Sequence, residues 1–193
     1  MAQTLRKEFA RYTYADYLKW EDGERWEIIE GIPYLMSPAP TRDHQGISME
    51  LSRQIATFLK GKPCKVFAAP FDVRLFPMDD DSDDTVVQPD IVVICDGAKL
   101  NKSGCAGAPD MVIEVLSPST ARHDKFIKLQ LYQKAGVREY WIVDTETKTV
   151  SVHILKNGEY VIKAYGDTDS APVCVLEGLD ISLADVFEDL PGA

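Results

Sequence analysis

The sequence predicts an α/β (α+β) fold in which a mixed β-sheet is flanked by helices. Two segments, Met111–Leu116 and Glu139–Asp144, are almost continuously apolar, as expected of central strands covered on both faces. Helical patterns at His44–Leu59 and Ala121–Ala135 alternate with such strands, which is typical of an α/β sandwich. The length of 193 residues suits a single domain, 1–193, with a real hydrophobic core.

The N-terminal part predicts a short helix, a hairpin and a long helix. Tyr14–Trp20 follows Thr13, a good N-cap residue, and is expected to be helical. Trp26–Met36 is expected to form a hairpin that turns at Gly31. The long helix is predicted by apolar residues at every fourth position, namely Ile47, Leu51, Ile55 and Leu59.

Short strands and an acidic segment are expected next. Lys65–Ala68 and Asp72–Phe76 have strand patterns, and Val86–Cys95 is expected to be a strand interrupted at Pro89. The acidic segment between them, Met78–Asp84, repels itself and is expected to be a solvated, mobile loop.

The helix Ala121–Ala135 is expected to be capped by the preceding Ser-Pro-Ser-Thr sequence and to end at Gly136. Phe126, Leu129 and either Tyr132 or Gln133 are expected to face inward or along the edge of the helix. The strand Glu139–Asp144 then begins a meander that turns at Asn157-Gly158, and a last strand and a short helix end the chain.

Composition limits the function and the location. The formal charge of −10 argues against a protein that simply coats nucleic acid, because phosphate contacts need clustered Lys and Arg. It does not exclude a nuclease, since divalent cations can supply the positive charge that faces phosphate. No apolar run approaches the ~18 residues of a membrane span, and the first residues lack the apolar stretch of a signal peptide. We therefore expect a cytoplasmic protein that contacts no membrane.

The four cysteines do not form a CxxC pair, which argues against a zinc knuckle or a thioredoxin-like site. Three of them, Cys64, Cys95 and Cys174, lie in or beside apolar segments. We expect buried, reduced thiols.

Two carboxylates interrupt apolar strands and are the main candidates for chemistry. Glu114 is the one charged residue within Met111–Leu116, and burying an unpaired charge costs several kcal/mol. Its partner is therefore a metal ion or a basic side chain. Asp90 follows Pro89 within a second apolar strand, and the alternative for this residue is an acid in a Pro-Asp turn. A pair of carboxylates on neighbouring strands would suit Mg²⁺.

The segments VQPDIVVI and PDMVIEVLSPST resemble the core motif of PD-(D/E)xK nucleases, with Pro89-Asp90 followed by Glu114. The lysine of the E-x-K motif is replaced by Leu116. Together with WEIIEGIPYLMSP, HQGISMEL and HDKFIKLQLYQKAGVREYWIVD, these segments are similar to the Uma-type family of restriction-endonuclease-like proteins, over about Tyr12 to Phe187. The resemblance implies a restriction-endonuclease-like fold, a divalent-metal site and a homodimer.

The resemblance also implies roles for individual residues. Asp90, Glu114 and the carbonyl of Val115 would bind Mg²⁺ or Mn²⁺. Lys128 on the following helix would take the place of the missing lysine, and Lys125 is the alternative. An exposed helix lysine is the competing interpretation of Lys128.

Three auxiliary residues follow from the same resemblance. Glu27 on the first hairpin could complete the site, or it could be an exposed strand acid. His44 could touch phosphate or water, or it could simply begin the long helix. Asp124 could orient Lys128 from one turn earlier, or it could be a first-turn acid favoured by the helix dipole.

Two functions are therefore compatible with the sequence. The first is a metal-dependent endonuclease that hydrolyses DNA phosphodiester bonds. The second is a catalytically inactive nuclease-fold protein that acts as an assembly or regulatory module. The acidity and the displaced lysine favour the second, whereas the pairing of Asp90 with Glu114 favours the first.

Overall fold

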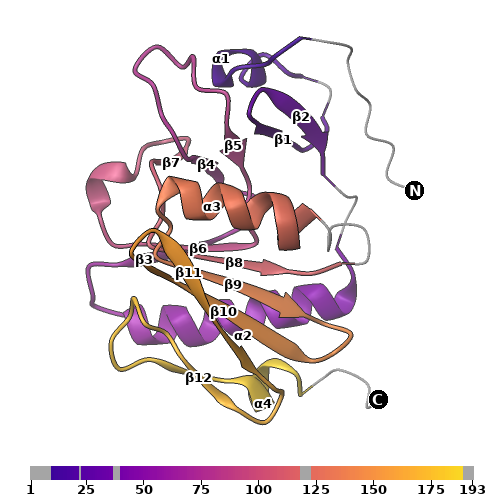
Figure 1. The fold of residues 1–193 in the computed structure, drawn as a ribbon, viewed down its shortest axis with the longest axis vertical. Helices are drawn as coiled ribbons and strands as arrows, with labels where there is room; N and C mark the ends of the chain where they lie inside the picture. The colour runs from indigo at the N-terminus through magenta and orange to yellow at the C-terminus, as the bar shows by residue number, and fades with distance from the viewer. Residues whose placement is uncertain (1–9, 22, 37–39, 118–122, 189–193) are drawn as a thin grey trace.

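The computed structural model describes residues 10–21, 23–36, 40–117 and 123–188, with the backbone alone for residues 123–125 (Figure 1). Its largest sheet is mixed and has the order β11-β10-β9-β8-β6-β3. These strands are Glu159–Tyr165, Thr149–Lys156, Glu139–Asp144, Met111–Val115, Ile91–Ile94 and Lys65–Ala68.

A five-stranded sheet has the order β2-β1-β5-β4-β7. Its strands are Ile32–Leu35, Trp26–Ile29, Val86–Val87, Asp72–Arg74 and Gly104–Ala106. A two-stranded sheet is formed by β12 (Ser170–Pro172) and β13 (Asp180–Ser182).

The described α-helices are α1 (Tyr14–Tyr17), α2 (Arg42–Leu59), α3 (Leu129–Ala135) and α4 (Leu183–Val186). A 3₁₀ turn spans Gly97–Lys99, and a π-helical segment, His123–Lys128, leads directly into α3. Among the described residues, none of the helices is both long enough and apolar enough to cross a membrane.

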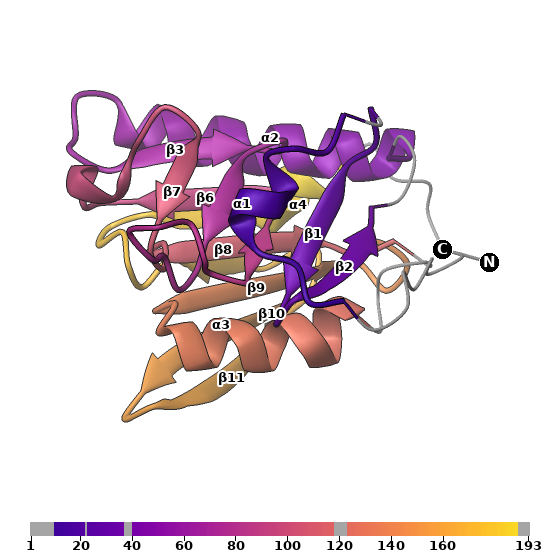
Figure 2. The ribbon, with the colours of Figure 1, turned by 90° about the horizontal axis from the view of Figure 1, so that it is seen from above.

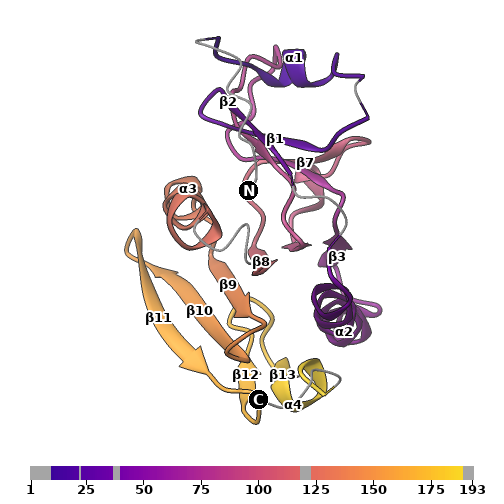
Figure 3. The ribbon, with the colours of Figure 1, turned by 90° about the vertical axis from the view of Figure 1, so that its right-hand side faces the viewer.

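The six-stranded sheet is covered on both faces, as its apolar strands predict. Helices α2 and α3 lie on opposite sides of β8 (Figures 2 and 3). One face packs against α2, α4 and the two-stranded sheet, and the other packs against α3 and the five-stranded sheet. The two faces alternate along β8, so that Ile113 and Val115 face α2 while Val112 and Leu116 face α3. The prediction of mixed β-structure flanked by helices is confirmed.

The predicted strand Val86–Cys95 is divided between the two large sheets. Residues before Pro89 form β5 in the five-stranded sheet, and residues after Asp90 form β6 in the six-stranded sheet. Pro89 lacks a backbone N–H and cannot continue a ladder, so the chain changes sheets there. The predicted break at Pro89 is therefore confirmed, and Asp90 lies at the junction of the two sheets.

The helix that follows β8 differs from its predicted face. Phe126 is 64% exposed, whereas Lys128 is 3% exposed and Tyr132 is fully buried. Lys128 and Tyr132 lie four residues apart and share the inward face, while a residue two positions from Lys128 points away from it. Phe126 therefore does not face inward, whereas the inward placement of Tyr132 is confirmed. Gly136 ends the helix in the left-handed conformation with φ 84°, as predicted.

The acidic segment is anchored at Asp81 and Asp83, whereas residues 78–80 and 82 are exposed to solvent as predicted. Arg74 forms an ion pair with Asp81 at 2.8 Å and a two-pronged one with Asp83, which is only 4% exposed. The backbone N–H of Tyr14 also donates to the Asp83 carbonyl at 2.8 Å. The guanidinium offsets the charges of two carboxylates, so the second half of the segment is tied to Arg74 while the first half stays in solvent.

Two cysteines form a disulfide, which corrects the expectation of reduced thiols. Cys64 and Cys95 stand one position beyond the paired residues Lys65 and Ile94, so the register of β3 and β6 brings them face to face. Cys105 is a buried free thiol, and Cys174 is exposed.

Candidate active site

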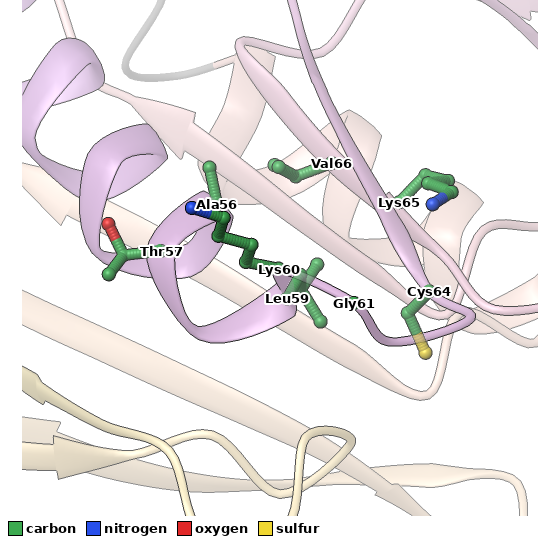
Figure 4. Close-up of a pocket in the computed structure, with 8 residues that line it drawn as sticks. All are labelled: Ala56, Thr57, Leu59, Lys60, Gly61, Cys64, Lys65 and Val66. Carbon is green, nitrogen blue, oxygen red and sulfur yellow. The ribbon is translucent and has the colours of Figure 1, made fainter.

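A pocket of about 480 Å³ lies between the end of α2 and the start of β3, lined among others by Lys60, Gly61 and Lys65 (Figure 4). It does not contain the candidate residues. His44 lies near the opposite end of the 18-residue helix α2, whose length is about 27 Å. The chemistry that the sequence predicts must therefore be sought where the two large sheets meet.

Glu114 is buried on the face of β8 that packs against α3, with 4% of its surface exposed. Its Oε1 accepts a hydrogen bond from the Lys128 ammonium at 2.8 Å and one from the Tyr132 hydroxyl at 2.8 Å. Both donors come from the inward face of the helical segment that follows the strand. The cost of burying this carboxylate is thereby offset by one positive charge and one neutral donor.

Glu27 reaches the same lysine from the other sheet. It lies on β1 and is 4% exposed, and its Oε1 is 2.9 Å from the Lys128 ammonium. The same oxygen accepts the backbone N–H of Gln88 at 2.8 Å. Lys128 is therefore held between two buried carboxylates, one from each large sheet.

Asp90 lies beside Glu114 at the end of the pairing between β6 and β8. The last pair is Ile91 with Ile113, so the next position in this register places Asp90 opposite Glu114. The Asp90 carboxylate accepts the Val115 backbone N–H at 2.8 Å and lies 3.1 Å from Nε2 of His44. The predicted adjacency of the strands that carry the two carboxylates is confirmed.

The carbonyl of Val115 faces the Asp90 side of β8. In an extended strand the N–H and C=O of one residue point the same way, and the Val115 N–H points at Asp90. The residue opposite Val115 in the register is Pro89, which has no N–H to donate. The strand pairing thus supplies this carbonyl with no donor, which suits a role as a metal ligand.

The donor set fits a hard divalent cation. Two carboxylates and a backbone carbonyl are the oxygen ligands that Mg²⁺ and Mn²⁺ take, with waters and phosphate completing the shell. Among the described residues no group of three or more His, Cys, Asp or Glu side chains is arranged to hold a metal. An ion here would therefore be held by two side chains, Asp90 and Glu114, and by the Val115 carbonyl.

Burial fixes the protonation state of the tyrosine donor. The pKa of the Tyr132 hydroxyl is raised well above its ordinary value, first by burial and then by the negative charges of Glu114 and Glu27. The hydroxyl therefore stays protonated at neutral pH and remains a hydrogen-bond donor to Glu114.

A second polar network holds the segment before Asp90. The side-chain oxygen of Gln88 accepts two hydrogen bonds from Arg25, at 3.0 and 2.8 Å. Its amide nitrogen donates to the Tyr17 hydroxyl at 2.9 Å and to Asp72 at 2.8 Å. Burial raises the pKa of Asp72. With its amide fixed on both sides, Gln88 can hold its backbone N–H on Glu27.

The structure brings most of the predicted site residues to one place. Glu27 and Glu114 share the ammonium of Lys128, which is inside the site rather than on the surface. Asp90 contacts His44 and the Val115 backbone, and the strand register places it opposite Glu114. The side chains of Asp124 and Lys125 lie outside the described residues.

Two residues that contact the site, Tyr132 and Gln88, were not predicted as site residues from the sequence. Tyr132 had a usable signal, because it lies one helical turn after Lys128 and so shares its face. Gln88 had none beyond its position before Pro89, since its contacts come from α1, from β1 and the residue before it, and from β4, which are distant in sequence.

The fold and the arrangement of these residues define a restriction-endonuclease-like protein. A protein from Anabaena variabilis ATCC 29413, described as "a putative nuclease belonging to DUF820", has the same fold, with a TM-score of 0.72. The two sequences are 23% identical, and the match covers 92% of this chain and 98% of the other.

Residues 14–184 match the model of the Uma2 family, described as "Putative restriction endonuclease". The chain belongs to this family. Two uncharacterized proteins of Synechocystis sp. (strain PCC 6803) are also similar. One, slr1290, is 26% identical over 173 residues and 88% of each chain. The other, sll1609, is 30% identical over 139 residues, which cover 68% of this chain and 74% of its own.

Proposed function

We propose that this protein is an endonuclease that hydrolyses DNA phosphodiester bonds with Mg²⁺ or Mn²⁺. The observation that carries the proposal is the strand register that places Asp90 opposite Glu114. Lys128 bonds Glu114, and the Val115 backbone faces Asp90. The family supports a nuclease, and the oxygen donors support a divalent cation.

Each residue would have a distinct task. A bound divalent cation would supply a water acidic enough to attack phosphate in line. His44 and the Val115 N–H hold Asp90, and Tyr132 holds Glu114, so both carboxylates are oriented before the substrate arrives. Lys128 would position the attacking water and offset the charge that develops on the phosphate oxygens.

Cleavage of DNA by the purified protein with Mg²⁺ or Mn²⁺ tests this proposal. Glu114→Gln keeps the shape of the side chain and removes its charge, so we expect metal-dependent cleavage to be lost. Lys128→Ala should lower turnover by about 10²–10⁴-fold, the usual scale for an acid–base group. Glu139→Gln is the matched control, because Glu139 is also a buried strand glutamate but bonds Trp141 and Val175 instead.

The second candidate is an inactive nuclease-fold protein that serves as an assembly or regulatory module. Two observations favour it: the charge of −10, and Leu116 at the position of the motif lysine. Titration calorimetry with Mn²⁺ on the wild type and on Glu114→Ala separates the two functions. Loss of Mn²⁺ binding in Glu114→Ala supports the enzyme. If the wild type cleaves DNA no faster than Glu114→Gln, the inactive-module function is supported instead.

The assembly and the location also belong to this proposal. Cutting both strands of a duplex with a small domain calls for two sites related by a two-fold axis. We therefore propose a homodimer in which each protomer is a single domain. The cytoplasmic location stays a prediction from the sequence.

A further inference from the structure

Lys128 occupies the space between two buried carboxylates as a fixed cation. Its ammonium is 2.8 Å from Oε1 of Glu114 and 2.9 Å from Oε1 of Glu27, and the side chain is almost completely buried. Each of these oxygens also accepts a second hydrogen bond, from Tyr132 and from the Gln88 N–H respectively. A cation that approaches Glu114 must therefore meet a carboxylate whose Oε1 already holds an ammonium.

The charge of the described side chains at this site is unbalanced by two units. With His44 counted as neutral, Glu27, Asp90 and Glu114 contribute three negative charges, and Lys128 contributes one positive charge. One divalent cation would neutralise the remainder, whereas a second would leave an excess of two positive charges in a region shielded from water. The charge count therefore favours a single ion.

We propose that Lys128 is a built-in competitor of the metal, which weakens divalent-cation binding at Glu114 and limits the site to one ion. The proposal rests on the proposed function, because it takes Glu114 as a metal ligand. Glu27 is the second holder of the ammonium, so Lys128 keeps a buried partner when Glu114 turns to the cation. The metal affinity of this protein would then be set by a lysine that is not itself a ligand.

The test is a Mn²⁺ titration of the metal-free protein by calorimetry, with electron paramagnetic resonance to count bound ions. Lys128→Met removes the ammonium but keeps a long apolar side chain. We expect this variant to bind Mn²⁺ at least about tenfold more tightly than the wild type, because the repulsion of a charge a few ångströms away is removed. The wild type should bind one ion.

Lys134→Met is the matched control. Lys134 lies on the same helix, but it is exposed and pairs with Glu30 at the surface. The Lys134→Met variant loses the same charge outside the site. Because exposed charges are screened, its Mn²⁺ affinity should stay within about twofold of that of the wild type. The gain in Lys128→Met should vanish in the double variant with Glu114→Gln, which places the effect at Glu114.

The proposal is overturned if Lys128→Met binds Mn²⁺ no more tightly than the wild type. It is also overturned if neither protein binds Mn²⁺. If Lys128→Met does not fold, Glu27→Gln replaces it. In this variant the Lys128 ammonium pairs with Glu114 alone and competes more strongly with the metal, so Mn²⁺ binding should weaken by about tenfold. Unchanged binding overturns the proposal. The proposed function fails separately, if Glu114→Gln leaves wild-type Mn²⁺ binding or DNA cleavage intact.

Discussion

At the scale of single residues, the site depends on buried charges whose partners come from other elements. Glu114 on β8 is held by Lys128 and Tyr132 from the helix, and Glu27 on β1 holds the same lysine. Removing one partner of such a cluster costs more than the interaction itself, because it leaves a charge in an apolar region without compensation. Substitutions here should therefore affect stability as well as activity.

Tyr132→Phe removes one donor from Glu114 and keeps the ring. We expect the free energy of unfolding to fall by about 1.5–3 kcal/mol, the range for hydrogen bonds to charged groups. Urea denaturation of the wild type and the variant measures this difference in unfolding free energy. Tyr160→Phe is the control, because the Tyr160 hydroxyl donates to the neutral Val137 carbonyl and should cost only about 1 kcal/mol. Equal losses in the two variants would contradict the role assigned to Tyr132.

His153 makes stability depend on pH. Burial lowers the pKa of this side chain below its ordinary value, so the folded protein favours neutral histidine. Its contribution is complete above a pH of about 6.5, the value expected in the unfolded chain, and is lost as the pH falls toward the folded-state value. His153→Gln should therefore show a flatter fall in unfolding free energy as the pH decreases below about 6.5. An unchanged slope in denaturation series at several pH values would refute this.

At the scale of elements, two interruptions build the site. Pro89 moves the chain from the five-stranded to the six-stranded sheet, which places Gln88 and Asp90 at their junction. The π-helical segment His123–Lys128 ends at the lysine that bridges Glu27 and Glu114. Such segments are uncommon and often occur at functional sites, where they change which side chains a helix directs inward.

The disulfide is an element-scale stabilisation that ties β3 to β6. It closes a separation of 31 residues, for which the chain-entropy model gives about 3–4 kcal/mol. The double variant Cys64→Ser/Cys95→Ser should lose this much stability in thermal or urea unfolding, and a reductant should have no further effect on it. Cys174→Ser is the control, because Cys174 is an exposed free thiol. Equal stability of the double variant and the wild type would show that the bond contributes nothing.

At the scale of the whole molecule, the exposed edge of the large sheet is the candidate dimer contact. The first hairpin and the meander Val150–Tyr165 both expose an edge strand. On β11, Val161 is 46% exposed and Ile162 is 58% exposed. An apolar edge strand without a neighbour favours pairing with another chain. Part of this edge is already capped, because the Tyr160 N–H donates to Gln133.

We expect a homodimer at micromolar concentration and a monomer for Ile162→Lys, because a charge on this edge opposes pairing. Light scattering coupled to gel filtration measures both. Met49→Lys, which places the same charge on an exposed apolar residue of α2, on the other face of the sheet, should remain dimeric. A monomeric wild type would contradict the prediction, and a dimeric Ile162→Lys would move the contact to the first hairpin.

Local signals were sufficient for much of the fold and for the choice of candidate residues. Apolar runs marked β8 and β9, a four-residue stripe marked α2, and Gly136 marked the end of α3, because each depends on neighbours within a few residues. A charge inside an apolar strand singled out Asp90 and Glu114 for the same reason.

Long-range pairing decided the rest. Only the register of β6 with β8 sets Asp90 opposite Glu114, and only the meeting of two sheets brings Glu27 to Lys128. The identity of each partner depends on which segments lie side by side, and a single sequence contains no local measure of that. The disulfide shows the same limit, because Cys64 and Cys95 are neighbours only across paired strands.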